Sequence, residues 1–189
     1  MKKKIVMMIM LLIGISSLSN AQKYLTKTGQ VSFYSESPLE NIEANNNNVN
    51  SALNVETGDF VFKVLIRSFE FEQALMQEHF NENYMDSEKY PNSTFVGKVI
   101  NLDEVDLSSK GSYDVEVKGK LTIHGVTREV ATNGTFVVGD DNIQATSVIE
   151  VAPADYDIKI PSAVIQNIAE IIEVRINVDL KKIEQVAAK

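Results

Sequence analysis

The stretch that decides the fold is 112–130, SYDVEVKGKLTIHGVTREV. Apolar and polar residues alternate along its first part, and the apolar set is Tyr113, Val115, Val117, Leu121 and Ile123. A period of two places all of these side chains on one face of an extended strand. His124-Gly125 then predicts a turn, and 126–138 predicts a second long strand that runs back. This hairpin has one apolar face, which the rest of the chain must cover.

Gly119 interrupts the apolar row of the first strand. A missing side chain inside a strand usually marks a bulge or a sharp bend, so we expect one here. Gly97 and Ala145 are small residues at comparable positions. If all three point inward, they favour a tunnel through the fold over a filled interior.

Further strands are predicted on both sides of the hairpin, because alternating apolar residues recur there. The segments are 30–34, 39–44, 59–69, 94–102, 143–151 and 174–181. A run of four asparagines at 45–48 favours a turn, since asparagine tolerates left-handed backbone and forms Asx turns.

The pattern changes to helical spacing at 70–80, EFEQALMQEHF, which predicts a short helix. Its apolar stripe continues beyond the helix and comprises Phe71, Leu75, Met76, Phe80, Tyr84 and Met85. The stripe fits a plug of core residues at one end of the fold. It also fits a lid over an apolar cavity, in which methionine supplies adaptable contacts, and both descriptions can hold at once. A second helical segment is predicted at 162–169.

Alternating strands in this number must close on themselves or stack as two sheets. Because several of them are long for a sandwich, we predict an all-β fold. It is an extended antiparallel β-barrel of about eight strands, with helical segments near 70–85 and 162–169. A barrel of this size either fills with side chains or holds one small ligand.

The first residues have the pattern of a secretory signal peptide. Three lysines precede an apolar run at 5–13, which is too short for a membrane span of about 20 residues. Ser19 and Ala21 are the small residues before a cleavage site at Gln22. We therefore expect a signal peptide at 1–21, one barrel domain at 22–189 and a periplasmic or secreted bacterial protein. Cleavage moves the formal net charge from −8 to −11.

Composition and motifs argue against several functions. An acidic chain without a basic patch argues against nucleic acid and anionic membrane surfaces. No cysteine, nucleophile elbow or metal-ligand spacing is present, and the chain has two histidines, so we predict neither an enzyme nor a metal or cofactor protein. His124 is expected to satisfy backbone groups near the turn. His79, beside the apolar stripe, is the better candidate for ligand binding.

Two separated motifs support a family resemblance. They are H-x(8)-E-K-Y-P at 79–91 and G-x-L-T-x-H-G-V-T at 119–127. With these motifs in this order, the chain resembles the YceI-like family, in a divergent branch that has Gln77 and Phe80 where arginine and leucine are usual. The resemblance implies a secreted lipocalin-like barrel that binds polyisoprenoids or other long amphiphiles in a central tunnel.

We therefore expect non-catalytic binding of a long amphiphilic lipid or polyisoprenoid in the bacterial envelope. The alternative is a solid barrel that serves as a protein-interaction module, and a homodimer is left open. The predicted ligand contacts combine the stripe with apolar strand residues: Phe33, Phe62, Val64, Leu75, Met76, His79, Phe80, Tyr84, Met85, Phe95, Val117 and Ile123. His79 or Tyr84 would offer a hydrogen bond to the head group.

Overall fold

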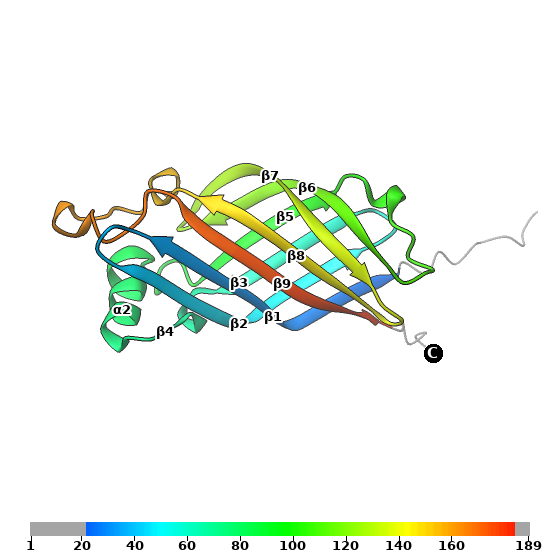
Figure 1. Cartoon of the computed structure of the whole chain (residues 1–189), viewed down its shortest axis with the longest axis horizontal. Coiled ribbons are helices and arrows are strands. Elements are labelled where there is room, and N and C mark those ends of the chain that lie inside the picture. Colours follow the sequence, from blue (N-terminus) through cyan, green and yellow to red (C-terminus); the bar gives the residue numbers. More distant parts are fainter. Residues whose placement is uncertain (1–21, 184–189) are drawn as a thin grey trace, which may run out of the picture.

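The computed structural model describes residues 22–183, so the predicted signal peptide lies outside the described residues. Within this range the chain forms an elongated, closed barrel of eight antiparallel strands, with a two-residue extra strand and one short α-helix (Figure 1). The barrel strands are β1 (Lys23–Glu36), β2 (Asn41–Asn54), β3 (Asp59–Leu65), β5 (Asn92–Val99), β6 (Gly111–Ile123), β7 (Val126–Val138), β8 (Asn142–Val151) and β9 (Ile172–Ile183). The extra strand is β4 (Glu70–Phe71), and the helix is α2 (Ala74–His79). The predicted fold class is confirmed.

The order around the barrel is β1-β9-β8-β7-β6-β5-β3-β2, and β2 closes it by pairing with β1. The predicted central hairpin is present, since β6 and β7 pair without interruption from Gly111 opposite Val138 to Ile123 opposite Val126. His124 and Gly125 form its turn with φ angles of 50° and 79°. The left-handed backbone at the second of these positions is the reason for glycine there.

The two ends of the barrel differ (Figure 1). One end, called the helix end here, carries α2 together with the segment 152–171 that connects β8 to β9. The opposite end, called the terminal end, carries the start of β1 and the end of β9. No helix among residues 22–183 is long and apolar enough to cross a membrane.

The interior near the terminal end is filled by side chains. The rings of Phe60 and Phe136 meet there edge to face, with centroids 5.9 Å apart. The buried apolar residues of this half are Tyr24, Val49, Leu53, Val99, Val138, Ile143, Val178 and Leu180, and Phe60, Val115 and Phe136 form its boundary with the cavity described below. Dense packing of this kind makes the terminal half a conventional core.

The turn predicted at 45–48 is wrong, because these asparagines lie inside β2. Asn46 is 1% exposed, and its side-chain amide donates to the Leu65 carbonyl at 2.8 Å while its oxygen accepts the Asn48 N–H at 2.9 Å. The pairing of β2 with β1 shifts register at this point. The Asx geometry therefore builds a β-bulge in a continuous strand, and the chain turns at 37–40 instead.

The bulge predicted at Gly119 is also wrong, since β6 pairs in unbroken register with both β5 and β7. Gly119 lies opposite Gly97, and the ring of Phe95 lies over the pair. A Cβ on Gly119 would come within 2.5 Å of the Gly97 Cα and 2.8 Å of the Phe95 ring. The glycines thus make room for this ring, while Ala145, the third small residue, does line the cavity described below.

Several predicted boundaries are corrected. The strand predicted at 30–34 begins already at Lys23. The strand predicted at 59–69 ends at Leu65, where a 3₁₀ turn over Ile66–Ser68 redirects the chain. The strand predicted at 94–102 corresponds to β5, which begins at Asn92 and ends at Val99.

The helical predictions are corrected as well. The helix predicted at 70–80 is divided between β4, α2 and a π-helical turn over Phe80–Tyr84. The segment predicted at 162–169 contains only a 3₁₀ turn over Ser162–Val164. A further 3₁₀ turn spans Pro153–Tyr156, where the sequence shows no regular pattern.

The barrel wall divides between β7 and β8 toward the helix end. These strands pair only from Gly134 opposite Ser147 to Val138 opposite Ile143, although β7 begins at Val126. The Ser147 hydroxyl donates to the Asn133 carbonyl at 2.7 Å and so replaces the next backbone rung. Beyond it an apolar cluster forms around the buried side chains of Leu121, Val151 and Tyr156.

Candidate functional site

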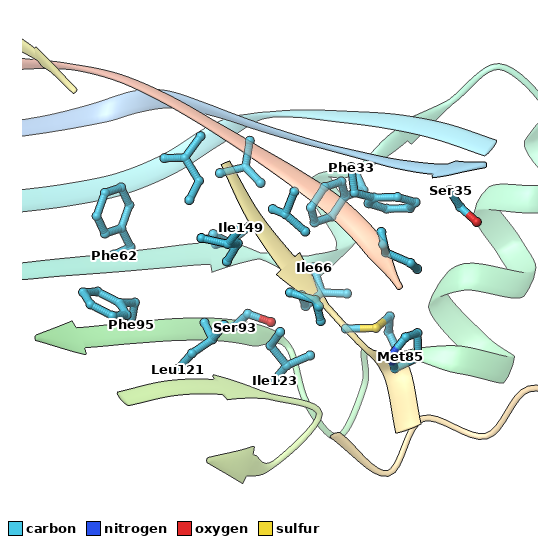
Figure 2. A pocket seen from close by; sticks show the side chains of 18 of the residues that line it. Phe33, Ser35, Phe62, Ile66, Met85, Ser93, Phe95, Leu121, Ile123 and Ile149 are labelled. Atoms are coloured by element: carbon cyan, nitrogen blue, oxygen red, sulfur yellow. The ribbon is translucent and has the colours of Figure 1, made fainter. Parts of the chain in front are cut away.

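The half of the barrel near the helix end is hollow and contains a cavity of about 370 Å³. Ligand pockets in proteins commonly have volumes of about 300–1,000 Å³, so this cavity is of useful size. Figure 2 shows its wall, with Phe62 and Phe95 far from α2 and with Ser35 and Met85 close to it. The cavity therefore extends from the barrel interior to the helix end.

The strands supply an apolar wall because alternate residues of each strand point inward. The inward apolar residues that line the cavity are Val31, Phe33, Phe62, Val64, Phe95, Val117, Leu121, Ile123, Val130, Ile149, Val151, Val174 and Ile176. Polar groups on this wall are hydroxyls, such as those of Ser93 and Thr132. Such a wall suits an apolar ligand that makes few hydrogen bonds.

Phe80 is the centre of an aromatic cluster that covers the helix end of the cavity. Its ring centroid lies 5.5 Å from Phe33, 5.4 Å from Phe69 and 5.0 Å from Phe71. The Phe71 N–H donates to the side-chain oxygen of Gln77 at 3.3 Å, which connects β4 to α2. The stripe is therefore both a packed cluster and part of the cavity wall, and the two descriptions hold together.

The segment 152–171 covers the cavity next to α2 (Figure 1). Its apolar lining residues are Pro153, Ile158, Ile160, Val164 and Ile168. The Ala169 N–H donates to the Ser35 hydroxyl at 2.8 Å, and Ser35 is 1% exposed. This buried hydrogen bond fixes the segment to β1.

Eleven of the twelve predicted contact residues line this cavity: Phe33, Phe62, Val64, Met76, His79, Phe80, Tyr84, Met85, Phe95, Val117 and Ile123. Leu75 does not, and its side chain is 60% exposed. Neighbouring helical residues point about 100° apart, so with Met76 turned to the cavity Leu75 points to solvent. Whether these residues contact a ligand stays a prediction.

Two groups of lining residues were not among the contacts predicted from the sequence. Ile149, Val174 and Ile176 lie on strands that alternation identified, but the inward face of those strands was not assigned to the site. The residues of 152–171 follow no period, and only their apolar character distinguishes them. A covering loop of this kind gives no periodic signal, because its contacts depend on where the barrel ends.

The two histidines have separate surroundings. His124 donates from Nδ1 to the Tyr156 carbonyl at 3.2 Å, so it serves the backbone, although not that of its own turn. Burial raises the pKa of the Tyr156 phenol above its ordinary value of 10.0. His79 lies at the end of α2, on the cavity. Among residues 22–183 no cluster of His, Asp and Glu is arranged to hold a metal ion.

Comparison with known proteins agrees with this architecture. The family model described as a YceI-like domain matches residues 23–180. UPF0312 proteins of Vibrio cholerae serotype O1 are 29% identical over 85 residues, which is 44% of this chain and 41% of theirs. The chain thus matches less than half the length of these relatives.

Solved structures share the fold at low sequence identity. A polyisoprenoid binding domain from Saccharophagus degradans, implicated in plant cell wall breakdown, has a TM-score of 0.73 at 14% identity, over 84% of this chain and 97% of that one. BcnA of Burkholderia cenocepacia has a TM-score of 0.62 at 15% identity, over 80% and 95% of the two chains. The Campylobacter jejuni YCEI protein has a TM-score of 0.60 at 15% identity, over 79% and 90%. With its barrel, its two motifs and a family match over most of its length, this chain belongs to the YceI-like family.

Proposed function

We propose that the protein binds one long apolar chain, such as an isoprenoid or fatty-acyl tail, in this cavity without chemical turnover. The observation that carries the proposal is the apolar cavity itself, enclosed by strands and covered at the helix end. A related fold from Saccharophagus degradans is described as a polyisoprenoid binding domain, which supports an isoprenoid as the tail. The sequence of 1–21 supports a place in the bacterial envelope.

Burial of the tail supplies the free energy of binding. Removing about 500 Å² of apolar surface from water yields about 12 kcal/mol at ~25 cal/mol per Å². Association itself costs about 4–15 kcal/mol, which offsets much of this gain. A long tail and a preformed cavity are therefore both required, and a short lipid should bind poorly.

The solid-barrel alternative receives no support from the helix half of the molecule. Side chains fill the terminal half, but the helix half contains the cavity. A protein-interaction module would not require this empty volume. Cavities also lower stability, since their lining residues lose packing contacts, so a hollow half suggests that the space is used.

Native mass spectrometry of the purified protein, combined with retention of a fluorescent prenyl probe, tests the proposal. Wild type should carry a lipid or retain the probe. Phe80→Ala, which removes the central ring of the aromatic cluster, should weaken probe binding by about 1–3 kcal/mol. Leu75→Ala is the matched control, because Leu75 lies on α2, directly before the turn that carries Phe80, but faces solvent.

A blocking variant adds an independent arm. Val64 lines the cavity, so Val64→Trp should fill part of the space and abolish probe retention while the protein remains folded by circular dichroism. If wild type neither carries a lipid nor retains any prenyl or fatty-acyl probe, the proposed function is wrong.

A further inference from the structure

We propose that the mouth of the cavity, meaning the part of its lining at the helix end with the polar residues Glu40, His79 and Asn167, selects ligands by head-group charge, and that Glu40 is the residue that does so. It favours a long-chain amphiphile with a cationic or neutral head group over one with an anionic head group. This inference rests on the proposed function, because it concerns the polar end of the same ligand.

The head group of such a ligand must lie at the helix end. The terminal half of the barrel is packed, with Leu53 at 1% and Leu180 at 0% exposed, so no polar group can pass through it. The split between β7 and β8 is bordered by apolar side chains that also line the cavity, such as Val130, Ile149 and Val151, so it offers a charged head group no partner. An apolar tail therefore points toward the barrel interior, and the head group stays among the residues at the mouth.

Glu40 is the one acidic residue among those that line the cavity in the described part of the chain, and no cationic side chain compensates its charge there. It lines the cavity from the β1–β2 turn, and no lysine or arginine is among the lining residues. Its backbone is fixed, since the Ser37 hydroxyl donates to the Glu40 carbonyl at 2.6 Å and accepts the Glu40 N–H at 3.2 Å. Within 22–183 the Glu40 carboxylate has neither an ion pair nor a hydrogen bond.

The segments around the mouth also carry a net negative charge. The connections at the helix end contain ten acidic and three basic residues, in the segments 37–40, 66–91 and 152–171. Two of the three basic residues are already engaged. Arg67 pairs with Glu88 at 3.3 Å, and the Lys89 ammonium lies 4.9 Å from the Tyr90 ring. The mouth therefore offers an anion little positive charge, in contrast to sites that bind phosphate through free lysine or arginine side chains.

The physical consequence is a discrimination between head groups. Beside apolar walls a charge is poorly solvated, so a like charge is repelled and an opposite charge attracted more strongly than in water. A phosphate head group would lose hydration next to an uncompensated carboxylate. An alcohol loses less, and an ammonium group gains an ion pair with Glu40.

The test compares three ligands that share one tail: geranylgeraniol, geranylgeranylamine and geranylgeranyl phosphate. Each displaces a fluorescent prenyl probe from wild type, at low and at high salt. The amine should bind at least as tightly as the alcohol, and the phosphate at least tenfold more weakly than the alcohol. High salt should reduce these differences, because screening weakens interactions between partly exposed charges.

Variants test whether Glu40 causes the difference in affinity between the head groups. Glu40→Gln should narrow the difference between amine and phosphate, and Glu40→Lys should reverse their order. Asp103→Lys introduces the same charge change in the β5–β6 connection at the terminal end and should leave the order unchanged. Equal binding of phosphate and alcohol by wild type, or an unchanged order in Glu40→Lys, would overturn the inference while the proposed function stands. Failure of all three ligands to displace the probe would overturn the inference, and the proposed function fails as well only if wild type also carries no lipid and retains no prenyl or fatty-acyl probe.

Discussion

Tyr90 packs against His124, with ring centroids 4.6 Å apart and ring planes at 61°. The same ring covers Gly125, where a Cβ would come within 2.5 Å of the Tyr90 Cε1 atom. The two motifs that support the family resemblance are thus in direct contact. Because His124 also donates to the Tyr156 carbonyl, three connections of the helix end meet at one imidazole.

Removing this ring should destabilise the helix end. We expect Tyr90→Ala to lower the free energy of unfolding by about 1–3 kcal/mol, less than for a fully buried aromatic residue, because Tyr90 is half-buried. Urea unfolding measures the loss. Tyr90→Phe keeps the ring and should stay close to wild type; a loss as large as that of Tyr90→Ala would assign the effect to the hydroxyl.

The asparagine run permits a test with neighbouring controls. Asn46→Ala leaves the buried Leu65 carbonyl without its donor and removes the acceptor for the Asn48 N–H. Such a loss should cost about 1–3 kcal/mol of unfolding free energy. Asn47 is exposed, so Asn47→Ala should stay within about 0.5 kcal/mol of wild type. Equal effects in chemical denaturation would contradict the β-bulge assignment.

Phe136 and Phe62 should separate stability from binding. Phe136 is 1% exposed and lies where the packed half borders the cavity, so Phe136→Ala should cost about 3–5 kcal/mol. Phe62 lines the cavity, where the space beside its ring is already empty, so Phe62→Ala should cost less stability and should weaken prenyl-probe binding. Thermal melts and probe titrations of both variants provide the measurement. A larger loss of stability for Phe62→Ala would show that the hollow half is packed in solution.

Gly119→Ala should be destabilising even though alanine is usually acceptable in a strand. The added methyl would meet the Val96 carbonyl and the Gly97 Cα at 2.5 Å, both of which are backbone atoms. Overpacking of this kind costs about 1–3 kcal/mol. Lys118→Ala, on the outward face beside it, is the control. The prediction fails if the two variants have the same melting temperature.

Asp106 gives a prediction for pH. Hydrogen bonds from the Ser108 and Ser109 hydroxyls lower the pKa of its carboxyl from 3.8 to about 2. Since the pKa is lower in the folded state, the stabilisation from these bonds is present above pH 3.8 and is lost as the pH falls through about 2. A carboxyl titration followed by NMR should have its midpoint near 2 in wild type. In a Ser108→Ala/Ser109→Ala variant the midpoint should return toward 3.8, and an unchanged midpoint would refute the assignment.

The sequence by itself determined the central hairpin and the approximate positions of most other strands. Alternation at 112–123 and 126–138 indicated β6 and β7 with their turn, because a period of two has one geometric solution. The change to helical spacing near residue 71 indicated which segment covers the cavity, because a helical period also places its apolar residues on one side. Met76, Phe80 and Tyr84 lie on one stripe of the sequence and on one wall of the structure.

The tertiary structure alone decided what those inward faces meet. An asparagine side chain that hydrogen-bonds to nearby backbone can end a strand or build a bulge. At Asn46 the bulge forms because the side-chain amide also donates to the Leu65 carbonyl on the neighbouring β3. Gly97 and Gly119 suggest open space, but the Phe95 ring occupies it. The filled and hollow halves have the same alternation along the chain. The two halves differ in how many large side chains point into the interior at the same height along the barrel axis. That number depends on the register of all eight strands together.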